Sequence, residues 1–228
     1  MAIIIIAELG GNLFPYSRER ITQLLGAAQR SGVDAVKVQL FVAEHFVGFE
    51  AVDKRRLEFP RGELGHFVNQ AHTLSLLAGA SVFDRQAVQL CVNAGVDFIK
   101  LAAREEDNVA LRRMVNRQFP GPVYRSVSWP LLREVESAPR EIIMGAVSIY
   151  PSIGLSNLGD QFLAGSMPSP FGWSSHTDHF ADCVAAIRSG ADAIEKHLKL
   201  ADTDEEARWS LDEQQMAVAV AAMRAADV

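Results

Sequence analysis

Two histidines in the second half of the chain have the residue type and position of metal ligands. His176 stands in the segment Gly172–Thr177, and His197 closes the segment Ala193–His197. Each would end a short apolar strand, and catalytic side chains collect at the carboxyl ends of parallel barrel strands. A pair of imidazoles suits manganese, iron, cobalt or zinc better than magnesium or calcium. We therefore predict a divalent-metal site; the alternative is that each ring only bonds a neighbouring backbone carbonyl.

Two lysines interrupt apolar segments that we expect to be strands. Lys37 lies within residues 35–39 and Lys100 within residues 98–101, although lysine is rarely buried without a partner. Each could form a structural ion pair, with Glu8 or Glu105 as the partner. Two lysines on facing strands, with serines nearby, more naturally bind a phosphate or carboxylate through charge-assisted hydrogen bonds. An anionic substrate is therefore the preferred interpretation.

Three glutamates lie near the ends of the predicted strands. Glu8, Glu105 and Glu195 are candidates for general acid–base catalysis, or for orienting a metal ligand from behind. Ion pairs with the lysines explain these glutamates nearly as well. The sequence leaves both roles open.

These residues can act together only if the fold brings the strand ends together, and the sequence pattern predicts such a fold. Short β-branched runs alternate with longer segments of helical period, which predicts an α/β protein with a parallel sheet. Eight such strands predict a (β/α)8 TIM barrel, in a single domain of residues 1–228. The helices after the fourth, fifth and sixth strands look short or broken, and the connection 41–61 is either a lid or a structural flap. The expected strands are 2–7, 34–40, 79–83, 97–101, 122–126, 141–147, 170–174 and 192–197, and the expected regular helices are 17–31, 62–77, 84–94, 178–189 and 210–226.

Composition narrows the class of protein. The 228 residues are 22% charged and 49% hydrophobic, with a formal net charge of -6, as in ordinary globular domains. The acidic balance and the lack of a Lys/Arg run argue against nucleic-acid binding. Residues 1–8 lack the basic region of a signal peptide, and no segment has the roughly 20 apolar residues of a membrane helix. We expect a cytoplasmic protein that contacts no membrane, with Cys91 and Cys183 as buried free thiols.

Several segments, taken in chain order, resemble the N-acetylneuraminate (sialic acid) synthase family and its pseudaminic and legionaminic acid relatives. They span nearly the whole chain, and the last of them is the most specific. The matching stretches are Ile5–Glu8, Gly32–Gln39, Phe83–Asp84, Phe98–Leu101, Ser148–Pro151, Asn157–Leu158, Ser174–Thr177 and Gly190–His197.

The resemblance implies a barrel that condenses phosphoenolpyruvate with the open-chain aldehyde of a sugar, usually with Mn2+, and releases phosphate. It implies metal ligation by His176 and His197, with Glu105 or Glu195 managing the proton. The resemblance also implies that Glu8, Gln39 and Glu105 face the sugar or the reacting water. It implies contacts with phosphoenolpyruvate at Lys37, Ser81, Lys100, Ser126, Asn157 and Ser174.

The chain departs from the family pattern inside these motifs. Ala103 stands where the family has a serine, and Arg104 or Arg125 would supply the missing phosphate contact if it pointed inward. Because other changes fall on the sugar side, we expect an altered acceptor. The remaining differences lie at Leu13, Val127, Ser128, Ser175 (for an aspartate) and Glu206 (for a late aspartate).

The chain ends after the eighth expected helix, so we expect the barrel alone, without the antifreeze-like C-terminal domain of this family. In the family that domain reaches into the partner subunit's site. Recognition of the sugar would then be lost, come from the connection 41–61, or come from another chain in a homodimer or a partner complex.

Three hypotheses follow. The first is a metal-dependent transferase that condenses phosphoenolpyruvate with an aldose or another aldehyde to a 2-keto-3-deoxy sugar acid. The second is a catalytically lapsed barrel that binds a ligand or a partner subunit, which the substitutions motivate. The third is another metal-dependent lyase or isomerase, because a barrel fold alone does not fix the reaction.

Overall fold

Parallel strands close into a barrel in the computed structural model, which describes residues 3–45, 54–148, 150–152 and 169–227. Each strand pairs with the next along the chain, and β1 also pairs with β8. This closure confirms the predicted (β/α)8 barrel. The strands are β1 (Ile4–Glu8), β2 (Ala35–Leu40), β3 (Leu77–Val82), β4 (Phe98–Leu101), β5 (Val123–Ser128), β6 (Glu141–Ala146), β7 (Phe171–Ser175) and β8 (Ala193–Leu198), with the short β9 (Ser210–Leu211) added beside β8.

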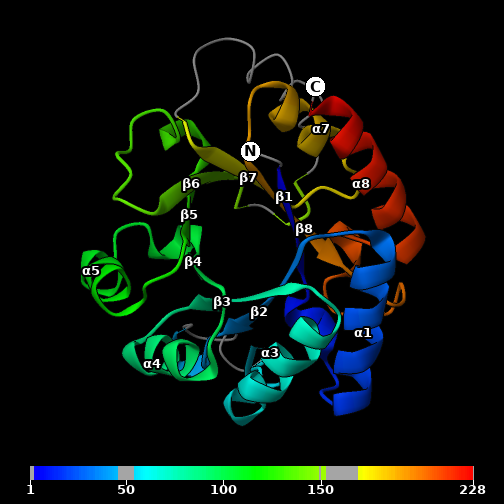
Figure 1. Ribbon diagram of the computed structural model, residues 1–228, viewed down its shortest axis with the longest axis horizontal. Coiled ribbons are helices and arrows are strands. Elements are labelled where there is room, and N and C mark those ends of the chain that lie inside the picture. Colours follow the sequence, from blue (N-terminus) through cyan, green and yellow to red (C-terminus); the bar gives the residue numbers. More distant parts are fainter. Residues whose placement is uncertain (1–2, 46–53, 149, 153–168, 228) are drawn as a thin grey trace.

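Helices lie around the strands (Figure 1), and most of them begin at a side-chain cap. Ser17 and Asp84 each accept a hydrogen bond from a backbone N–H of the first turn, as favoured N-cap residues do. Gly32 and Gly95 end the same two helices in the left-handed conformation, with φ of 79° and 68°. The described helices are α1 (Arg18–Ser31), α3 (Leu64–Thr73), α4 (Arg85–Ala94), α5 (Val109–Gln118), α7 (Ala181–Arg188) and α8 (Glu213–Ala226).

Two expectations about the helices are wrong. The helix expected over residues 62–77 ends at Thr73, because Ser75 takes a left-handed conformation (φ 60°) and Leu77 already pairs with Ala35 in the sheet. The helix after β4, expected to be broken, is the regular α5, which Asn108 caps. The segment after β5 holds only the 3-10 turn Trp129–Leu131. The element expected after β6 falls on residues 153–168, outside the described chain.

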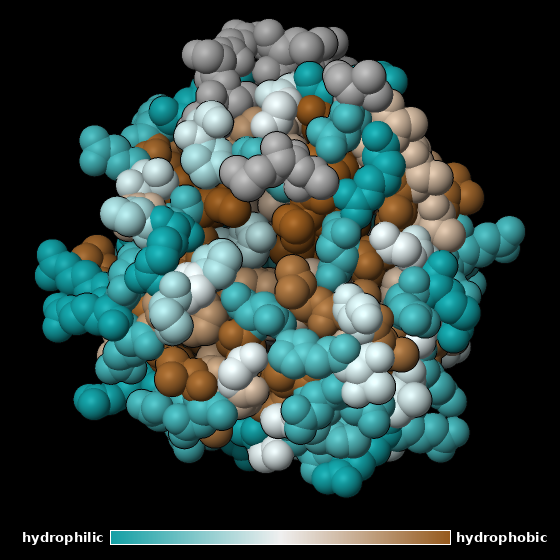
Figure 2. All heavy atoms as spheres, in the orientation of Figure 1, coloured by the Kyte–Doolittle hydropathy of each residue, from teal (hydrophilic) through white to brown (hydrophobic). Residues whose placement is uncertain are grey.

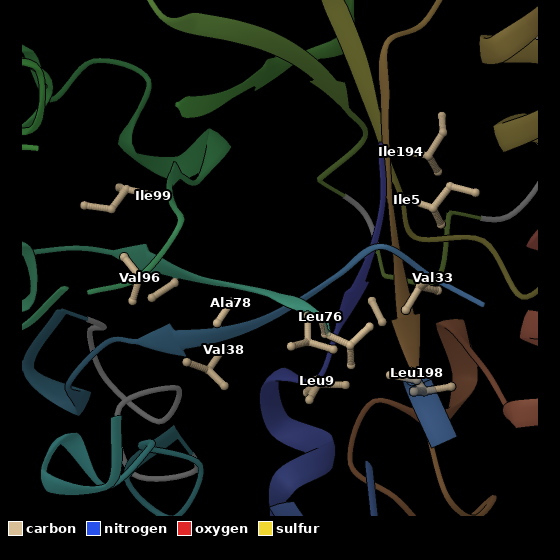
Figure 3. Packing of buried hydrophobic residues seen from close by; sticks show 14 of the residues in the cluster. Ile5, Leu9, Val33, Val38, Leu76, Ala78, Val96, Ile99, Ile194 and Leu198 are labelled. Atoms are coloured by element: carbon tan, nitrogen blue, oxygen red, sulfur yellow. The ribbon is translucent and has the colours of Figure 1, made fainter. Parts of the chain in front are cut away.

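Apolar side chains fill both faces of the barrel wall. Ile5 and Ile194 are paired on β1 and β8 and point outward toward the helices (Figure 3). A separate buried cluster fills the inside of the barrel near the amino ends of its strands, and we call it the apolar plug. Gly79 is required beside it, because an added Cβ would lie 2.1 Å from the Phe98 ring. The plug consists of Ile6, Ala35, Phe98, Tyr124, Met144 and Ala193.

The outer surface is mixed. On the face seen in Figure 2, hydrophobic residues gather toward the middle and hydrophilic side chains around the rim. Cys91 and Cys183 are free and buried, as predicted. No helix in the described part of the chain reaches the length and apolar character that a membrane span requires.

The segment between β5 and β6 forms no long helix among the described residues. In this part of the barrel Glu141 links β6 to α5. Its carboxylate accepts two hydrogen bonds from Arg112 (2.7 and 2.8 Å), one from Asn116 (2.8 Å) and one from the backbone N–H of Ala138 (2.9 Å). Burial opposes ionisation of Glu141, but these donors outweigh it and lower the pKa to about 2. The ionised side chain therefore holds this part of the barrel together.

Glu141→Gln should lower the free energy of unfolding by about 2 kcal/mol at pH 7, because it leaves a partly buried guanidinium without its charged partner. Glu141 contributes its stability above its unfolded pKa near 4.5 and loses it as the pH falls toward 2. The variant should therefore lose less stability than the wild type between these pH values. Urea denaturation across this range tests both effects. Glu213→Gln, which breaks the exposed pair with Arg30, should change little.

Candidate active site

A cavity of about 320 Å³ opens at the carboxyl ends of the strands. It lies beyond the apolar plug along the barrel interior, because strand side chains alternate and every second residue points inward. On β2 the inward series runs from Ala35 to Lys37, and on β8 from Ala193 to Glu195 and His197. The plug thus forms one layer and the cavity-lining polar residues form the next.

Two buried lysines and two buried glutamates lie at the bottom of the cavity, and we call these four residues the charged floor. Lys37, Lys100 and Glu195 line the cavity, and Glu8 lies against Lys37. The Lys100 Nζ donates to Glu195 Oε1 at 2.5 Å and to Ser174 Oγ at 3.0 Å. The Lys37 Nζ bonds Glu8, and it lies 3.7 Å from Glu195 Oε2. None of the four is more than 4% exposed. The charged floor is therefore a chain of alternating charges, Glu8, Lys37, Glu195 and Lys100.

Burial and the neighbouring charges shift the pKa values of two residues of the charged floor, Lys37 and Glu195. Burial lowers the pKa of Lys37 to about 8; Glu195 opposes this shift and Lys100 adds to it. Burial opposes ionisation of Glu195, but Lys100 and Lys37 outweigh it and hold the pKa of Glu195 below its ordinary value. Glu195 is thus a fixed anion near neutral pH, and Lys37 has a pKa close enough to neutral to exchange a proton there.

The two predicted metal ligands face each other across one side of the cavity, with ring centres 5.5 Å apart. His176 Nδ1 lies 3.0 Å from the carbonyl oxygen of Val147, and His197 Nδ1 lies 3.0 Å from Glu206 Oε2. With a proton assigned to each Nδ1, both Nε2 lone pairs remain free for a ligand. Burial, with the nearby His197, lowers the pKa of His176 well below its ordinary value, which favours the neutral, metal-binding form.

This arrangement fits a metal held by two protein ligands. Metal-binding histidines commonly donate their second ring N–H to a carbonyl or a carboxylate, and here Val147 and Glu206 accept in those roles. The expected alternative, a bond to a backbone carbonyl, is present at His176, but it occupies only one ring nitrogen. Within the described residues no group of three or more His, Cys, Asp or Glu side chains is placed to hold a metal. Water or substrate oxygens would have to complete the coordination.

A glycine lets the polar groups beside His197 approach one another. Gly10 has φ of 29°, and an added Cβ there would lie 2.6 Å from Glu206 Oε2, 2.8 Å from Gln39 Nε2 and 2.8 Å from Glu8 Oε1. These three side chains therefore converge on the backbone of Gly10. No side chain larger than hydrogen fits at this position without moving them.

Buried Asn12 holds Glu206 in place. Its Oδ1 accepts from the Glu206 backbone N–H at 2.8 Å, and its Nδ2 donates to the Leu198 carbonyl and to Ser210 Oγ, both at 2.9 Å. Sequence reasoning noted Glu206 only as a difference from the family pattern and gave it no role. The spacing of nine residues between His197 and Glu206 only weakly indicates that they are in contact, because that contact also depends on Asn12 in the turn after β1.

The structure brings together most of the predicted site residues. Glu8 reaches the site through its bond with Lys37. Asn157 lies outside the described residues. From the connection 41–61, Phe41, Lys54 and Leu57 reach the cavity, and residues 46–53 lie outside the description. The predicted residues that line the cavity are Lys37, Gln39, Ser81, Lys100, Arg104, Ser126, Ser174, His176, Glu195 and His197.

Two charged residues that the sequence analysis considered lie away from the cavity. Glu105 does not line the cavity: the chain leaves β4 in the 3-10 turn Ala103–Glu105, and the Glu105 carboxylate accepts from the Asn108 side chain at 2.8 Å. Arg125 points away from the cavity, because it alternates with inward Ser126; it donates to the Glu136 carbonyl at 2.8 Å. The ion-pair partner of Lys100 is Glu195 instead of Glu105.

Aromatic rings that sequence reasoning missed line the wall beside the histidines. Tyr150 packs on His176 with ring centres 4.3 Å apart, and Trp209 lies 5.5 Å from Tyr150 and 6.2 Å from His197. Both rings line the cavity. Tyr150 lies in one of the segments that resemble the family, but no sequence pattern around Trp209 indicated that its ring lines the cavity.

Comparisons with known proteins show the family of the chain. The sequence model of the NeuB family matches residues 24–228. The N,N'-diacetyllegionaminic acid synthase of Legionella pneumophila is 26% identical over 88% of this chain. The spore coat polysaccharide biosynthesis protein SpsE of Bacillus subtilis is 27% identical over 87% of it. The matched regions span 65% and 60% of these relatives.

Solved structures share the barrel. An N-acetylneuraminic acid synthetase from Leptospira borgpetersenii, in complex with citrate, superposes with a TM-score of 0.83 at 23% identity; the match covers all of this chain and 84% of that one. B. subtilis SpsE has a TM-score of 0.78 at 23% identity over 99% of this chain and 68% of that one. At these identities the likeness concerns the fold.

Gly10→Ala should lower the free energy of unfolding by about 2 kcal/mol, because the new methyl group overlaps three polar side chains. Gly65→Ala in α3 is the matched control, since nothing lies within 4 Å of its added Cβ. That change should raise stability by about 0.5 kcal/mol through helix propensity. Urea denaturation of the two variants tests the contrast, and equal effects would contradict the packing described at Gly10.

Proposed function

Because the chain belongs to the NeuB family, we propose that it condenses phosphoenolpyruvate with the aldehyde of a sugar or a related acceptor. The products are a 2-keto-3-deoxy sugar acid and phosphate. One observation carries the proposal: a single cavity joins two buried lysines to a pair of histidines with free Nε2 atoms. The first group suits an anionic enol ester, and the second suits a metal beside a carbonyl.

The charged floor would hold the phosphate and carboxylate of phosphoenolpyruvate. Each ammonium group has three N–H donors, so a lysine that already pairs with a glutamate keeps donors for a ligand. Ser81 and Ser174 bond the same two ammonium groups, at 2.7 and 3.0 Å. Ser126 Oγ is buried without a hydrogen-bond partner, which supports a further contact to the ligand. In this proposal the ion pairs with the glutamates orient the lysines for the ligand. The structural and the ligand-binding interpretation of the lysines are therefore compatible.

The histidine pair would hold Mn2+ or a similar ion through the two Nε2 atoms. Such an ion supplies Lewis-acid polarisation of the acceptor aldehyde. His176 and His197 contribute neutral nitrogen ligands, and the Val147 carbonyl and Glu206 fix their orientation. Glu8 and Gln39, which converge on Gly10 next to Glu206, would face the acceptor hydroxyl groups.

The reaction balances with one water. The methylene carbon of phosphoenolpyruvate bonds the aldehyde carbon, the former enol carbon takes up water, and the C–O bond to phosphate breaks. Lys37, with its pKa near 8, is the group that would take or return a proton, while Glu195 stays ionised. Phe41, Leu57 and Phe83 form a buried apolar cluster that lines the cavity and would keep bulk water from competing.

A second candidate function is ligand binding without catalysis. It is favoured by the pairing of both lysines with carboxylates and by Ala103, which gives the cavity wall no hydroxyl group. This candidate predicts binding of phosphoenolpyruvate with no release of phosphate in the presence of any aldehyde. A lyase or isomerase would instead turn over a 2-keto acid without phosphoenolpyruvate.

The proposed reaction should release inorganic phosphate from phosphoenolpyruvate with Mn2+ and a suitable member of an aldehyde panel. Lys100→Met should lower kcat/KM about 100-fold, since a hydrogen bond between charged groups is worth up to roughly 3 kcal/mol. Arg30→Met, at an arginine whose ion pair with Glu213 is exposed on the outer helices, should leave turnover unchanged. Phosphate release that does not need an aldehyde, or that survives Lys100→Met, would contradict this assignment.

Metal binding should depend on the histidines and can be measured apart from turnover. His197→Gln should weaken Mn2+ binding about 100-fold in an electron paramagnetic resonance titration, because it removes a direct ligand. Phosphoenolpyruvate affinity, measured calorimetrically without metal, should change little. His72→Gln is the control, because this half-exposed histidine pairs with Asp97 on the outside of the barrel. Equal Mn2+ affinity in both variants would contradict the proposed metal site.

A further inference from the structure

Lys196 is a buried cation on the outer face of β8. Its neighbours Glu195 and His197 point into the cavity, so strand alternation directs Lys196 to the opposite side. The residue is 0% exposed. Among the residues that the structure describes, no carboxylate lies within 4.0 Å of its ammonium group. A buried charge with only neutral partners is costly unless each of its hydrogens finds an acceptor.

The Lys196 ammonium bonds three oxygens, which matches its three donors. It donates to Ser175 Oγ at 3.2 Å, to the Thr177 carbonyl, and to the Trp209 carbonyl at 3.2 Å. Ser175 and Thr177 are the residues immediately before and after His176. One side chain of β8 therefore holds the chain on both sides of a histidine from β7.

The third bond reaches the segment that supports His197. Trp209 ends the 3-10 turn Ala207–Trp209, which directly follows Glu206, and the Glu206 carboxylate bonds His197. Lys196 thus connects the supports of both histidines while its own backbone adjoins His197.

Asp182 braces the same region from α7. This buried carboxylate accepts from Trp173 Nε1 at 2.8 Å. It also lies 3.1 Å from Thr177 Oγ1, whose single hydrogen it shares with the His179 carbonyl at 2.7 Å. Thr177 is therefore held by its hydroxyl group on one side and by its carbonyl on the other. Lys196 and Asp182 thus both hold the residue that follows His176.

We propose that Lys196 is a positioning residue for the metal site. Its three hydrogen bonds set the place of His176 relative to His197 and Glu206, and through that geometry they set the affinity of the histidine pair for a divalent cation. This inference rests on the metal-binding part of the proposed function, but not on the identity of the acceptor or on turnover.

Lys196→Met keeps the length and apolar stem of the side chain and removes all three bonds. Supports behind metal ligands commonly contribute about 10-fold to affinity, so the variant should bind Mn2+ about 10-fold more weakly. With Co2+ as the probe, its visible absorption spectrum should differ in shape from that of the wild type. Phosphoenolpyruvate affinity without metal should be unchanged, because the charged floor lies on the other face of β8. Arg30→Met, which breaks an exposed ion pair with Glu213 on the outer helices, is the control and should match the wild type in each measurement.

Several results would overturn the proposal. A folded Lys196→Met protein with wild-type Mn2+ affinity would show that the residue only stabilises the fold, as would a lower melting temperature alone. Equal losses of Mn2+ and phosphoenolpyruvate affinity would indicate general disruption instead of positioning. If Lys196→Met does not fold, Ser175→Ala carries the test: it removes one acceptor and should weaken Mn2+ binding about threefold, and unchanged affinity would refute the inference.

The wild-type protein separates this inference from the proposed reaction. Mn2+ binding without phosphate release would count against the reaction alone and leave Lys196 testable. Failure of the wild type to bind Mn2+ or Co2+ would refute both the metal site and the role of Lys196.

Discussion

Charge neutralisation at the buried bottom of the cavity is the constraint on which this barrel interior depends. Lys37 and Lys100 lie directly above the apolar plug, where isolated ammonium groups would be costly. Glu8 and Glu195 offset that cost and, in doing so, fix both amine positions. The serines, the close approach at Gly10 and the two histidines are arranged around this set of charges. Stability and ligand recognition therefore rest on the same contacts.

A floor with as many carboxylates as ammonium groups has a consequence for binding. A dianionic ligand that enters alone meets Glu8 and Glu195 as well as the lysines, so its net attraction is modest. A divalent cation at His176 and His197 would add positive charge close to the same cavity. Each ligand would then favour the other, and thermodynamic linkage makes such coupling equal in both directions. The proposed metal would contribute to substrate affinity as well as to reactivity.

Sequence patterns predicted what depends on local periodicity. Strand alternation alone directs Lys37, Lys100 and Glu195 inward, and it also directs Arg125 outward. Glu105 was misplaced because it lies in a 3-10 turn, where alternation has already ended. Contacts between segments far apart in the sequence produce no periodic pattern from which they could be predicted. Glu206 reaches His197 because the Asn12 side chain, the close approach at Gly10 and the pairing of β9 with β8 hold that segment against the barrel.

The apolar plug also decides how molecules can travel. Ile6, Phe98, Tyr124 and Met144 fill the barrel below the charged floor, so the cavity is a dead end with its entrance at the carboxyl ends of the strands. A ligand on the floor must enter before any ligand that stands above it, and must leave after it. Binding and release in such a site follow a compulsory order, and an excess of the second ligand would trap the first or block its entry.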